Sequence, residues 1–363
     1  MKCLENMDRL KIDPESVLKL LSLYEFRGKD YYYEFILKQN INQIAKQTIE
    51  KDTFYLGKIL NLDITNNRQK LIIQKDSEPK TNDERVLRNI KNVLKIIKDE
   101  GDDFNMSSNE ILHLGIRLFE GVSKVQYNTM IINAQENLLT VKKTVSKRKD
   151  IDELIRAYNS LISSRKYEIT SLVTNFFVDF INLDLFNIGN DIIGLLTAYT
   201  LLYKEKFKML NCVSFFEILY DSLEEFNQAK LKANFNWKEG FSETKDLNKL
   251  LIQLLLIGYS KIDRLASDTK FDANLSKSYN IENTIQRLGE VFTKEEIRQR
   301  HPYVSLSTID RTLKRLKDEN KIRPNGVGRS ASWIKLVEYE RFEAQPSRQL
   351  SLYDIMMADD QEQ

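Results

Sequence analysis

The chain has 363 residues, which is long enough for two domains that each bury a core of their own. Its net charge of +2 excludes a global attraction to nucleic acid, so any basic surface must be local. With 42% hydrophobic residues, 30% charged residues, 12 glycines and 5 prolines, the composition predicts a soluble and mainly α-helical fold.

We expect no segment of this sequence to place the protein in a membrane or to direct it out of the cell. No apolar run approaches the roughly 18 uncharged residues that a membrane span requires. The first residues contain no apolar stretch of the kind found in a secretory signal. We therefore expect a cytoplasmic protein with no membrane partner.

The chain is poor in residues that commonly bind metals or act as nucleophiles. Its two cysteines, Cys3 and Cys212, are far apart and cannot build a structural zinc site. Its two histidines, His113 and His301, have no Cys or second His at a catalytic or ligand spacing. We expect a half-buried structural role for His113 and a surface position for His301. No metal site is predicted.

Residues 1–80 are predicted to form an N-terminal helical region. One helix starts at Pro14, another opens with the tyrosines at 31–33, and a third covers 41–60. The polar stretch 75–80 then separates this region from the next.

Turn-forming residues concentrate in the middle of the chain, at 180–197 (FINLDLFNIGNDIIGLLT). Gly189 lies between asparagines at 187 and 190, and an apolar helix is predicted over 192–203. A loop that leads into a helix N-terminus presents free backbone N–H groups and is a potential anion site. The alternative is a helix–loop–helix corner with no ligand.

This loop resembles the signature of the Fic (Fido) family, H-P-F-x-[D/E]-G-N-G-R-x-G-R. The architectural positions of the signature are matched by Phe186, Gly189, Asn190 and Gly194. The chemical positions are not matched: Asp184 stands at the histidine, Ile188 at the acidic residue and Ile192 at the first arginine. Further replacements are Leu185 at the proline, Asp191 at the second glycine and Leu195 at the last arginine.

The resemblance covers roughly residues 40–265, and it implies a Fic-like core at 81–265. In that family two helices open the core, a flap hairpin positions a target segment, a helix precedes the signature, and further helices close the bundle. The corresponding segments are 84–98 with 106–122, 127–142, 152–161, and 212–227 with 247–265. Many members also carry an inhibitory helix with [S/T]-x-x-x-E-[G/N]; here Thr53 matches, but Gly57 stands at the glutamate.

The resemblance implies a chemistry that this chain is poorly equipped to perform. The family usually transfers AMP from ATP to a protein hydroxyl, and it needs a base, a carboxylate for Mg²⁺ and arginines for phosphate. Ile188 cannot bind a metal and the Ile192 side chain cannot bind phosphate, while Asp184 and Asp191 would repel the triphosphate. We therefore expect a degenerate Fic domain without a cofactor. ATP and Mg²⁺ would bind only if Asp184 supported residual transfer.

Past a stretch expected to be a linker (268–280), residues 281–337 resemble a winged helix. The pattern is a helix at 281–290, a second opened by the capping box Thr293–Glu296, a third from Ser307, and a hairpin at 322–336. In winged helices the third helix enters the major groove of duplex DNA and the wing contacts the backbone. The expected contacts are Ser307, Thr308, Arg311, Lys314, Arg315, Arg323 and Arg329. The alternative is a protein-binding winged helix.

Residues 338–363 are charged and then sparse in apolar residues, and we expect them to form a mobile tail. Within the tail, Gln349, Leu350, Leu352 and Tyr353 resemble the short peptide by which bacterial proteins bind the replication sliding clamp. The alternative is a last amphipathic helix that docks on the body.

Three functions remain open from the sequence. The first is a DNA-binding regulator or scaffold built on a catalytically degenerate Fic domain. The second is a protein nucleotidyltransferase with residual or altered activity through Asp184. The third is an interaction protein tethered by its clamp-like tail. A homo-oligomer is compatible with each of them.

Overall fold

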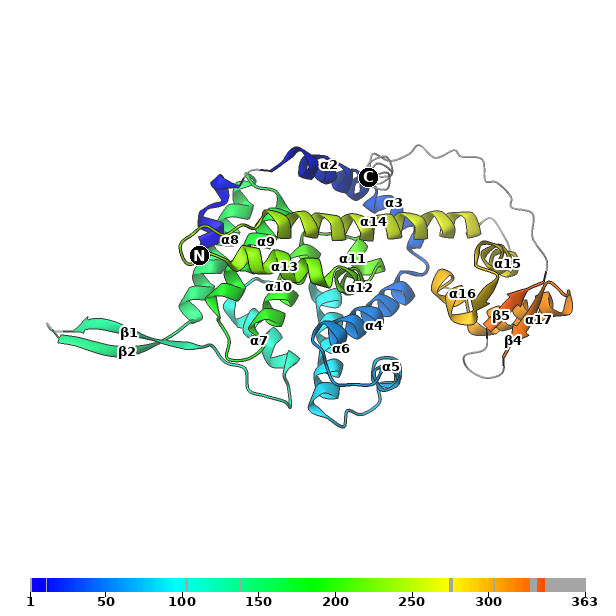
Figure 1. Ribbon diagram of the computed structural model, residues 1–363, viewed down its shortest axis with the longest axis horizontal. Helices are drawn as coiled ribbons and strands as arrows, with labels where there is room; N and C mark the ends of the chain where they lie inside the picture. Colours follow the sequence, from blue (N-terminus) through cyan, green and yellow to red (C-terminus); the bar gives the residue numbers. More distant parts are fainter. Residues whose placement is uncertain are drawn as a thin grey trace. The chain divides into compact units, whose positions relative to one another are not determined.

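The computed structural model describes residues 2–10, 12–101, 104–136, 139–273, 277–302, 304–326 and 332–336, with the backbone alone at 132–136, 139–143, 271–273 and 277–279. These residues form mainly helices, with two small antiparallel sheets (Figure 1). They group into two compact units: unit 1 is Met1–Arg27 with Thr48–Tyr259, and unit 2 is Gly28–Gln47 with Ser260–Gln363. This division departs from the expected ranges, because residues 28–47 group with the C-terminal part of the chain.

Unit 1 is a helical bundle that carries one β-hairpin. Its elements are α1 (Lys2–Glu5), the 3-10 helix η1 (Met7–Arg9), α2 (Pro14–Gly28), α5 (Asn66–Lys75), α6 (Asn82–Glu100), α7 (Ser108–Leu118), β1 (Thr129–Glu136), β2 (Leu139–Ser146), α8 (Arg148–Ser164), α9 (Ile169–Leu183), α10 (Asn190–Lys204), α11 (Met209–Cys212), α12 (Phe215–Asp221) and α13 (Leu223–Asn234). Helices α4 (Ile41–Ile59) and α14 (Lys245–Ala273) each contain one of the boundaries between the units, and a third boundary precedes Gly28, the last residue of α2.

The core of unit 1 is built around α9 and α10. Every residue of α9 from Thr170 to Ile181 is buried, and so are most residues of α10. A helix that is apolar on all sides must lie inside a bundle, whereas amphipathic helices such as α6 cover it with one face. Gly194 allows α9 and α10 to approach, because a Cβ there would lie 2.7 Å from Phe180 Cδ1.

Polar side chains set where several of the surrounding helices begin. Thr81 caps α6 by accepting from the Glu84 N–H, and Ser107 caps α7 by accepting from the Glu110 N–H. The expected hairpin is present: β1 and β2 pair in antiparallel register from Thr129 opposite Ser146 to Glu136 opposite Leu139.

Two expected boundaries were wrong. The segment 212–227, expected as one helix, is broken at Ser222, which ends α12 and begins α13. The expected linker at 268–280 is largely helical, because α14 continues to Ala273 and α15 begins at Lys277. None of the helices that the structure describes is long and apolar enough to cross a membrane.

Unit 2 combines α3 (Asp30–Leu37) and the start of α4 with the C-terminal elements. These are the end of α14, α15 (Lys277–Arg287), β3 (Val291–Thr293), α16 (Lys294–Arg300), α17 (Leu306–Asp318), β4 (Ile322–Asn325) and β5 (Ser332–Lys335). The three strands form an antiparallel sheet in the order β3-β5-β4. Phe292, Ile309, Leu313 and Leu316 belong to its apolar core, against which Trp333 packs.

A buried carboxylate holds the first helix of unit 1. Asp179 of α9 has no exposed surface, and its oxygens accept hydrogen bonds from the backbone N–H groups of Lys2, Cys3 and Leu4 at 2.9–3.0 Å. Trp237 Nε1 donates a fourth hydrogen bond at 2.7 Å. The helix N-terminus and the indole therefore supply the donors that a buried carboxylate requires.

We expect Asp179→Ala to lower the free energy of unfolding by about 2–4 kcal/mol, because four donors lose their acceptor. Urea unfolding measures this change. The matched control is Asp191→Ala, which removes an exposed carboxylate and should cost less than about 1 kcal/mol. Equal stability of the two variants would contradict the capping role of Asp179.

Candidate functional site

The loop between α9 and α10 is closed by the side chain of Asn190. Its Oδ1 accepts from the N–H groups of Leu185 (2.8 Å) and Phe186 (3.3 Å), and its Nδ2 donates to the Ile181 carbonyl at 3.1 Å. The asparagine therefore pairs three backbone groups of the turn that enters α10. Asn190, which matches the asparagine of the signature, therefore has a structural role in this loop.

Gly189 precedes α10 in a conformation and at a close contact that together favour glycine. Its φ is +66°, in the left-handed region, and a Cβ there would lie 2.3 Å from Phe119 Cε2. Asp184, at the C-terminal end of α9, also has a positive φ of +49°, which aspartate tolerates better than most residues. The loop is therefore a tight and specific turn, as the sequence predicts.

The segment before the hairpin pairs with this loop. Asn128 N–H donates to the Leu185 carbonyl (2.8 Å), and Asn187 N–H donates to the Gln126 carbonyl (3.2 Å). The rings of Tyr127 and Phe186 stack with centroids 5.0 Å apart. The hairpin β1–β2 thus begins directly beside the loop and projects from it (Figure 1).

Asp184, the residue at the histidine position of the signature, lies at the base of the hairpin. Its side chain is 68% exposed, its Oδ2 accepts from Asn128 Nδ2 at 3.2 Å, and it lies 3.6 Å from Lys147 Nζ. Asp191 is 64% exposed and lies 3.1 Å from Lys230 Nζ. The expected repulsion of an anion by both aspartates is therefore overstated, since a lysine compensates each charge.

The two isoleucines of the loop leave it without a metal ligand or a phosphate-binding side chain. Ile188 is partly buried, and Ile192 is 6% exposed and belongs to the core. Within the described residues, no group of three or more His, Cys, Asp and Glu side chains could hold a metal ion. The residues of the loop do not fit Mg²⁺, and the remaining donors to an anion are backbone N–H groups at the start of α10.

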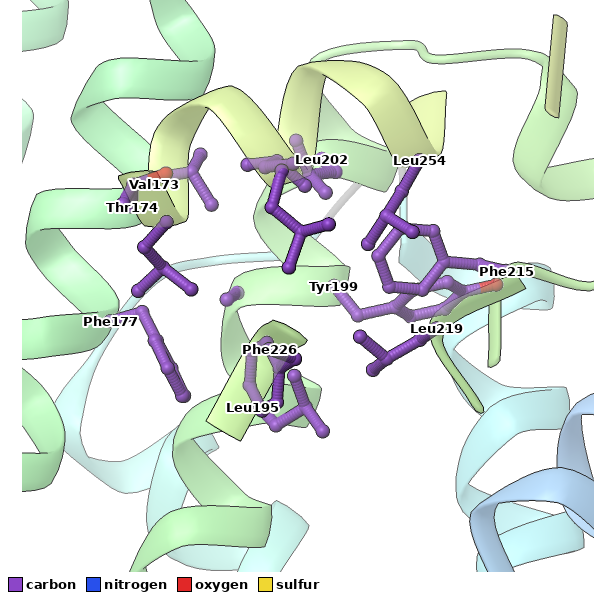
Figure 2. Close-up of a pocket in the computed structure, with 14 residues that line it drawn as sticks. Val173, Thr174, Phe177, Leu195, Tyr199, Leu202, Phe215, Leu219, Phe226 and Leu254 are labelled. Carbon is purple, nitrogen blue, oxygen red and sulfur yellow. The ribbon is translucent and has the colours of Figure 1, made fainter. Parts of the chain in front are cut away.

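An apolar pocket of about 50 Å³ lies among α9, α10, α12, α13 and α14. Its lining is almost entirely apolar, and Leu195, which replaces the last arginine of the signature, lies in it with Phe177 and Tyr199 (Figure 2). An apolar pocket of this size has no means to orient a charged ligand. Sequence reasoning did not predict this pocket, because its lining residues come from five helices.

Both histidine predictions were wrong. His113 is exposed and lines a surface groove of about 340 Å³ with Glu110 and Arg117. His301 is 3% exposed, and its Nε2 is hydrogen-bonded to Thr284 Oγ1. The position of His301 depends on a contact between residues 17 apart in sequence, which no local pattern reveals.

The structure places most of the residues expected to contact DNA on the surface of unit 2, and one lies outside the described residues. Ser307, Arg311 and Lys314 are exposed on α17, Thr308 is partly exposed, and Arg323 is exposed on β4. Helix α17 begins at Leu306, one residue earlier than expected, because Ser305 caps it by accepting from the Thr308 N–H. Arg329 and the tail residues Gln349, Leu350, Leu352 and Tyr353 lie outside the described residues.

Arg315 does not share the free face of α17. Its guanidinium contacts Glu282 Oε2 and Glu319 Oε1, both at 2.6 Å, and Lys321 contacts the same two glutamates. Burial alone would raise the pKa of Glu282, but the hydrogen bonds from Lys321 and Arg315 lower it below its usual value. We name these four residues the ionic cluster; it joins α15 to α17 and to the residue before β4.

We expect Asn190→Ala to lower the free energy of unfolding by about 1–3 kcal/mol, because it leaves the N–H groups of Leu185 and Phe186 unpaired. Chemical denaturation provides the measurement. Asp191→Ala, one residue later and exposed, is the control and should change stability by less than about 1 kcal/mol. If Asn190→Ala is as stable as the control, the side chain does not close the loop.

Comparisons with known proteins support the fold. No protein-family model matches the sequence, and no curated protein matches it. A solved structure of a Fic family protein from Desulfovibrio desulfuricans G20 is similar, with a TM-score of 0.54 and 12% identity over 92% of this chain and 99% of that one. A Fic domain containing signaling protein from Bacteroides thetaiotaomicron VPI-5482 has a TM-score of 0.51 and 15% identity, over 68% of this chain and 96% of that one. The chain therefore has a Fic-like fold, as the residues of the loop predict.

Proposed function

We propose that this protein is a DNA-binding regulator or scaffold in which a winged helix is joined to a Fic-like body that does not transfer nucleotides. The observation that carries the proposal is the exposed, basic and hydroxyl-bearing face of α17. Ser307, Arg311 and Lys314 are spaced i, i+4 and i+7, so they lie along one side of the helix. The apolar residues Ile309, Leu313 and Leu316 are buried on the other side.

The order of elements in unit 2 supports a winged helix. Helix α15, strand β3, helices α16 and α17 and strands β4 and β5 follow one another, and the sheet order is β3-β5-β4. Helix, strand, helix, helix and a two-stranded wing is the arrangement in which the third helix reads a major groove. The capping box of Thr293 and Glu296 at the start of α16 is formed as predicted.

Contacts within unit 2 distinguish the basic side chains that are exposed from one that is already paired with glutamates. Arg311 and Lys314 are exposed and available to phosphates or base edges, and Arg323 extends the basic surface onto β4. Arg315 is assigned to the ionic cluster, since Glu282 and Glu319 already neutralise it. The DNA-contacting set therefore centres on Arg311 and Lys314, with Ser307 and Thr308 at the helix N-terminus.

We expect the full chain to bind duplex DNA with an affinity that falls linearly on a log–log plot against salt. Replacing both Arg311 and Lys314 by alanine should reduce the slope by about two units, because each phosphate contact releases about one counterion. Fluorescence anisotropy with a mixed-sequence duplex, between about 50 and 200 mM salt, measures the slope.

The control for this experiment is Lys95→Ala, which removes an exposed cation from α6 in unit 1 and should leave the slope unchanged. Arg315→Ala should lower the stability of the chain with little effect on the slope, because its charge is already paired. Absence of salt-dependent binding to the duplex, or a slope that the double variant leaves intact, would reject the DNA-binding function. The module would then be a protein-binding winged helix.

The Fic-like body has features that favour scaffolding over catalysis. Nucleotide transfer requires a general base, a metal-binding carboxylate and cations for phosphate, and the loop offers Asp184, Ile188 and Ile192 at those positions. Asp184 is occupied by Asn128 and Lys147, and the turn around it is closed by its own hydrogen bonds. The loop is therefore suited to hold the hairpin in place.

We expect ATP with Mg²⁺ to give no saturable heat of binding to the full chain in calorimetry, since no described group can hold the metal. Asp184→His alone should not produce labelling by radioactive ATP, because Ile188 and Ile192 are unchanged. Tight binding of ATP that Asp184→Ala abolishes would contradict the proposal and favour the nucleotidyltransferase.

A further inference from the structure

Three helices of unit 1 bring ionisable side chains into the core, away from the loop. Asp52 of α4 has no exposed surface, and its Oδ1 accepts from Ser214 Oγ (2.7 Å) and the Phe216 N–H (3.1 Å). Tyr199 of α10 lies beside it, because the centroids of the Tyr199 and Phe216 rings are 5.0 Å apart. Lys98 of α6 packs against the same helix, where the Tyr203 hydroxyl donates to the Lys98 carbonyl at 3.1 Å, and its ammonium group interacts electrostatically with Asp52. These contacts place a carboxylate, an ammonium group and a phenol in one buried neighbourhood.

Each of these three side chains has one buried polar atom that forms no hydrogen bond with the described residues. The atoms are Asp52 Oδ2, Lys98 Nζ and Tyr199 OH, and each exposes less than 1 Å². Buried polar groups nearly always have a hydrogen-bond partner, either protein or ordered water, because leaving one unpaired is destabilising. Three such atoms from three separate helices therefore indicate a shared binding position.

The charges at this position decide the class of ligand. The carboxylate of Asp52 and the ammonium of Lys98 balance each other, so the position has no net charge to attract an ion. Other groups also interact electrostatically with the three side chains: Glu217 with Asp52, Cys212 with Lys98 and Tyr203 with Tyr199. Enclosure on all sides restricts the ligand to a very small neutral molecule that both donates and accepts hydrogen bonds.

We propose that Asp52, Lys98 and Tyr199 enclose a binding site for one internal water molecule, which links α4 to α6 and α10 through hydrogen bonds. The water accepts a hydrogen bond from Lys98 Nζ, donates one to Asp52 Oδ2, and shares its third with the Tyr199 hydroxyl. Three hydrogen bonds are the usual number for a buried water in a globular protein. The site would connect α4 to the interior of unit 1 without a direct contact between the charged atoms.

A high-resolution crystal structure of the full chain tests the site directly. The expected result is a single density peak within hydrogen-bonding distance of Asp52 Oδ2, Lys98 Nζ and Tyr199 OH. A dry site, or a direct contact between Lys98 Nζ and Asp52 Oδ2, would overturn the proposal.

A pair of matched variants tests the site in solution. Tyr199→Phe removes one partner of the water, so it should lower the Tm by about 2–4 °C and remove one long-lived water from ¹⁷O magnetic relaxation dispersion. Tyr158→Phe is the control. The Tyr158 hydroxyl is also buried and unpartnered, but its electrostatic interaction is with Glu205 and not with Asp52 or Lys98. If both variants retain the same number of long-lived waters as the unmodified chain, the site is rejected.

The pH dependence of stability gives a third readout. Burial raises the pKa of Asp52 from 3.8 to about 6, so stability that is present below pH 3.8 is lost as the pH rises through 6. Burial lowers the pKa of Lys98 from 10.5 to about 8, so stability that is present above pH 10.5 is lost as the pH falls through 8.

The contribution of this pair to the urea midpoint should therefore be lowest between about pH 6 and 8 and should rise on either side. Asp52→Asn should flatten the rise on the acid side. If Asp52→Asn leaves the rise of the urea midpoint below pH 6 unchanged, Asp52 is not the buried ionised partner and the site is rejected.

Discussion

The amide of Asn190 is the interaction on which the arrangement of the loop depends. It pairs backbone groups on both sides of the turn, at Ile181 and at Leu185 and Phe186, and so fixes how α9 leads into α10. The carbonyl of Leu185 and the N–H of Asn187 are then presented to the segment that precedes β1. One side chain thereby orders a turn, the direction of a buried helix and the root of the hairpin. A glycine before it and a glycine after it permit the close packing that this geometry demands.

Much of the fold could be predicted from local pattern. Helices α6, α7, α8 and α10 and the hairpin lie where periodicity and the signature resemblance put them, within a few residues. Caps at Thr81 and Ser107 follow ordinary sequence rules. What local pattern could not predict are features decided by distant residues. The grouping of 28–47 with the C-terminal elements depends on contacts such as that of Tyr33 with Asp263, which lie 230 residues apart.

The candidate sites show the same limit. The positions of Asp184, Gly189 and Asn190 in the turn could be predicted from their residue types, but the lysines that compensate Asp184 and Asp191 could not. Lys147 and Lys230 come from the end of the hairpin and from α13, and their contacts are made only after the bundle forms. On α17, helical spacing predicted one basic face, yet Arg315 turns to the ionic cluster because Glu282 of another helix is near. Helical spacing identifies which residues share a face, but it does not identify which of their charges are already paired with another residue.

The two tryptophans of the chain are distributed so that each compact unit contains one. Trp237 of unit 1 donates its indole N–H to the buried carboxylate of Asp179, and Trp333 of unit 2 packs against the apolar core of the C-terminal elements. Intrinsic fluorescence therefore contains two separable signals. The Trp237 signal is quenched or shifted when its hydrogen bond to a carboxylate is lost, and the Trp333 signal is quenched or shifted when the hydrophobic core is exposed. With one tryptophan replaced at a time, the same chain reports the unfolding of each unit without any attached dye.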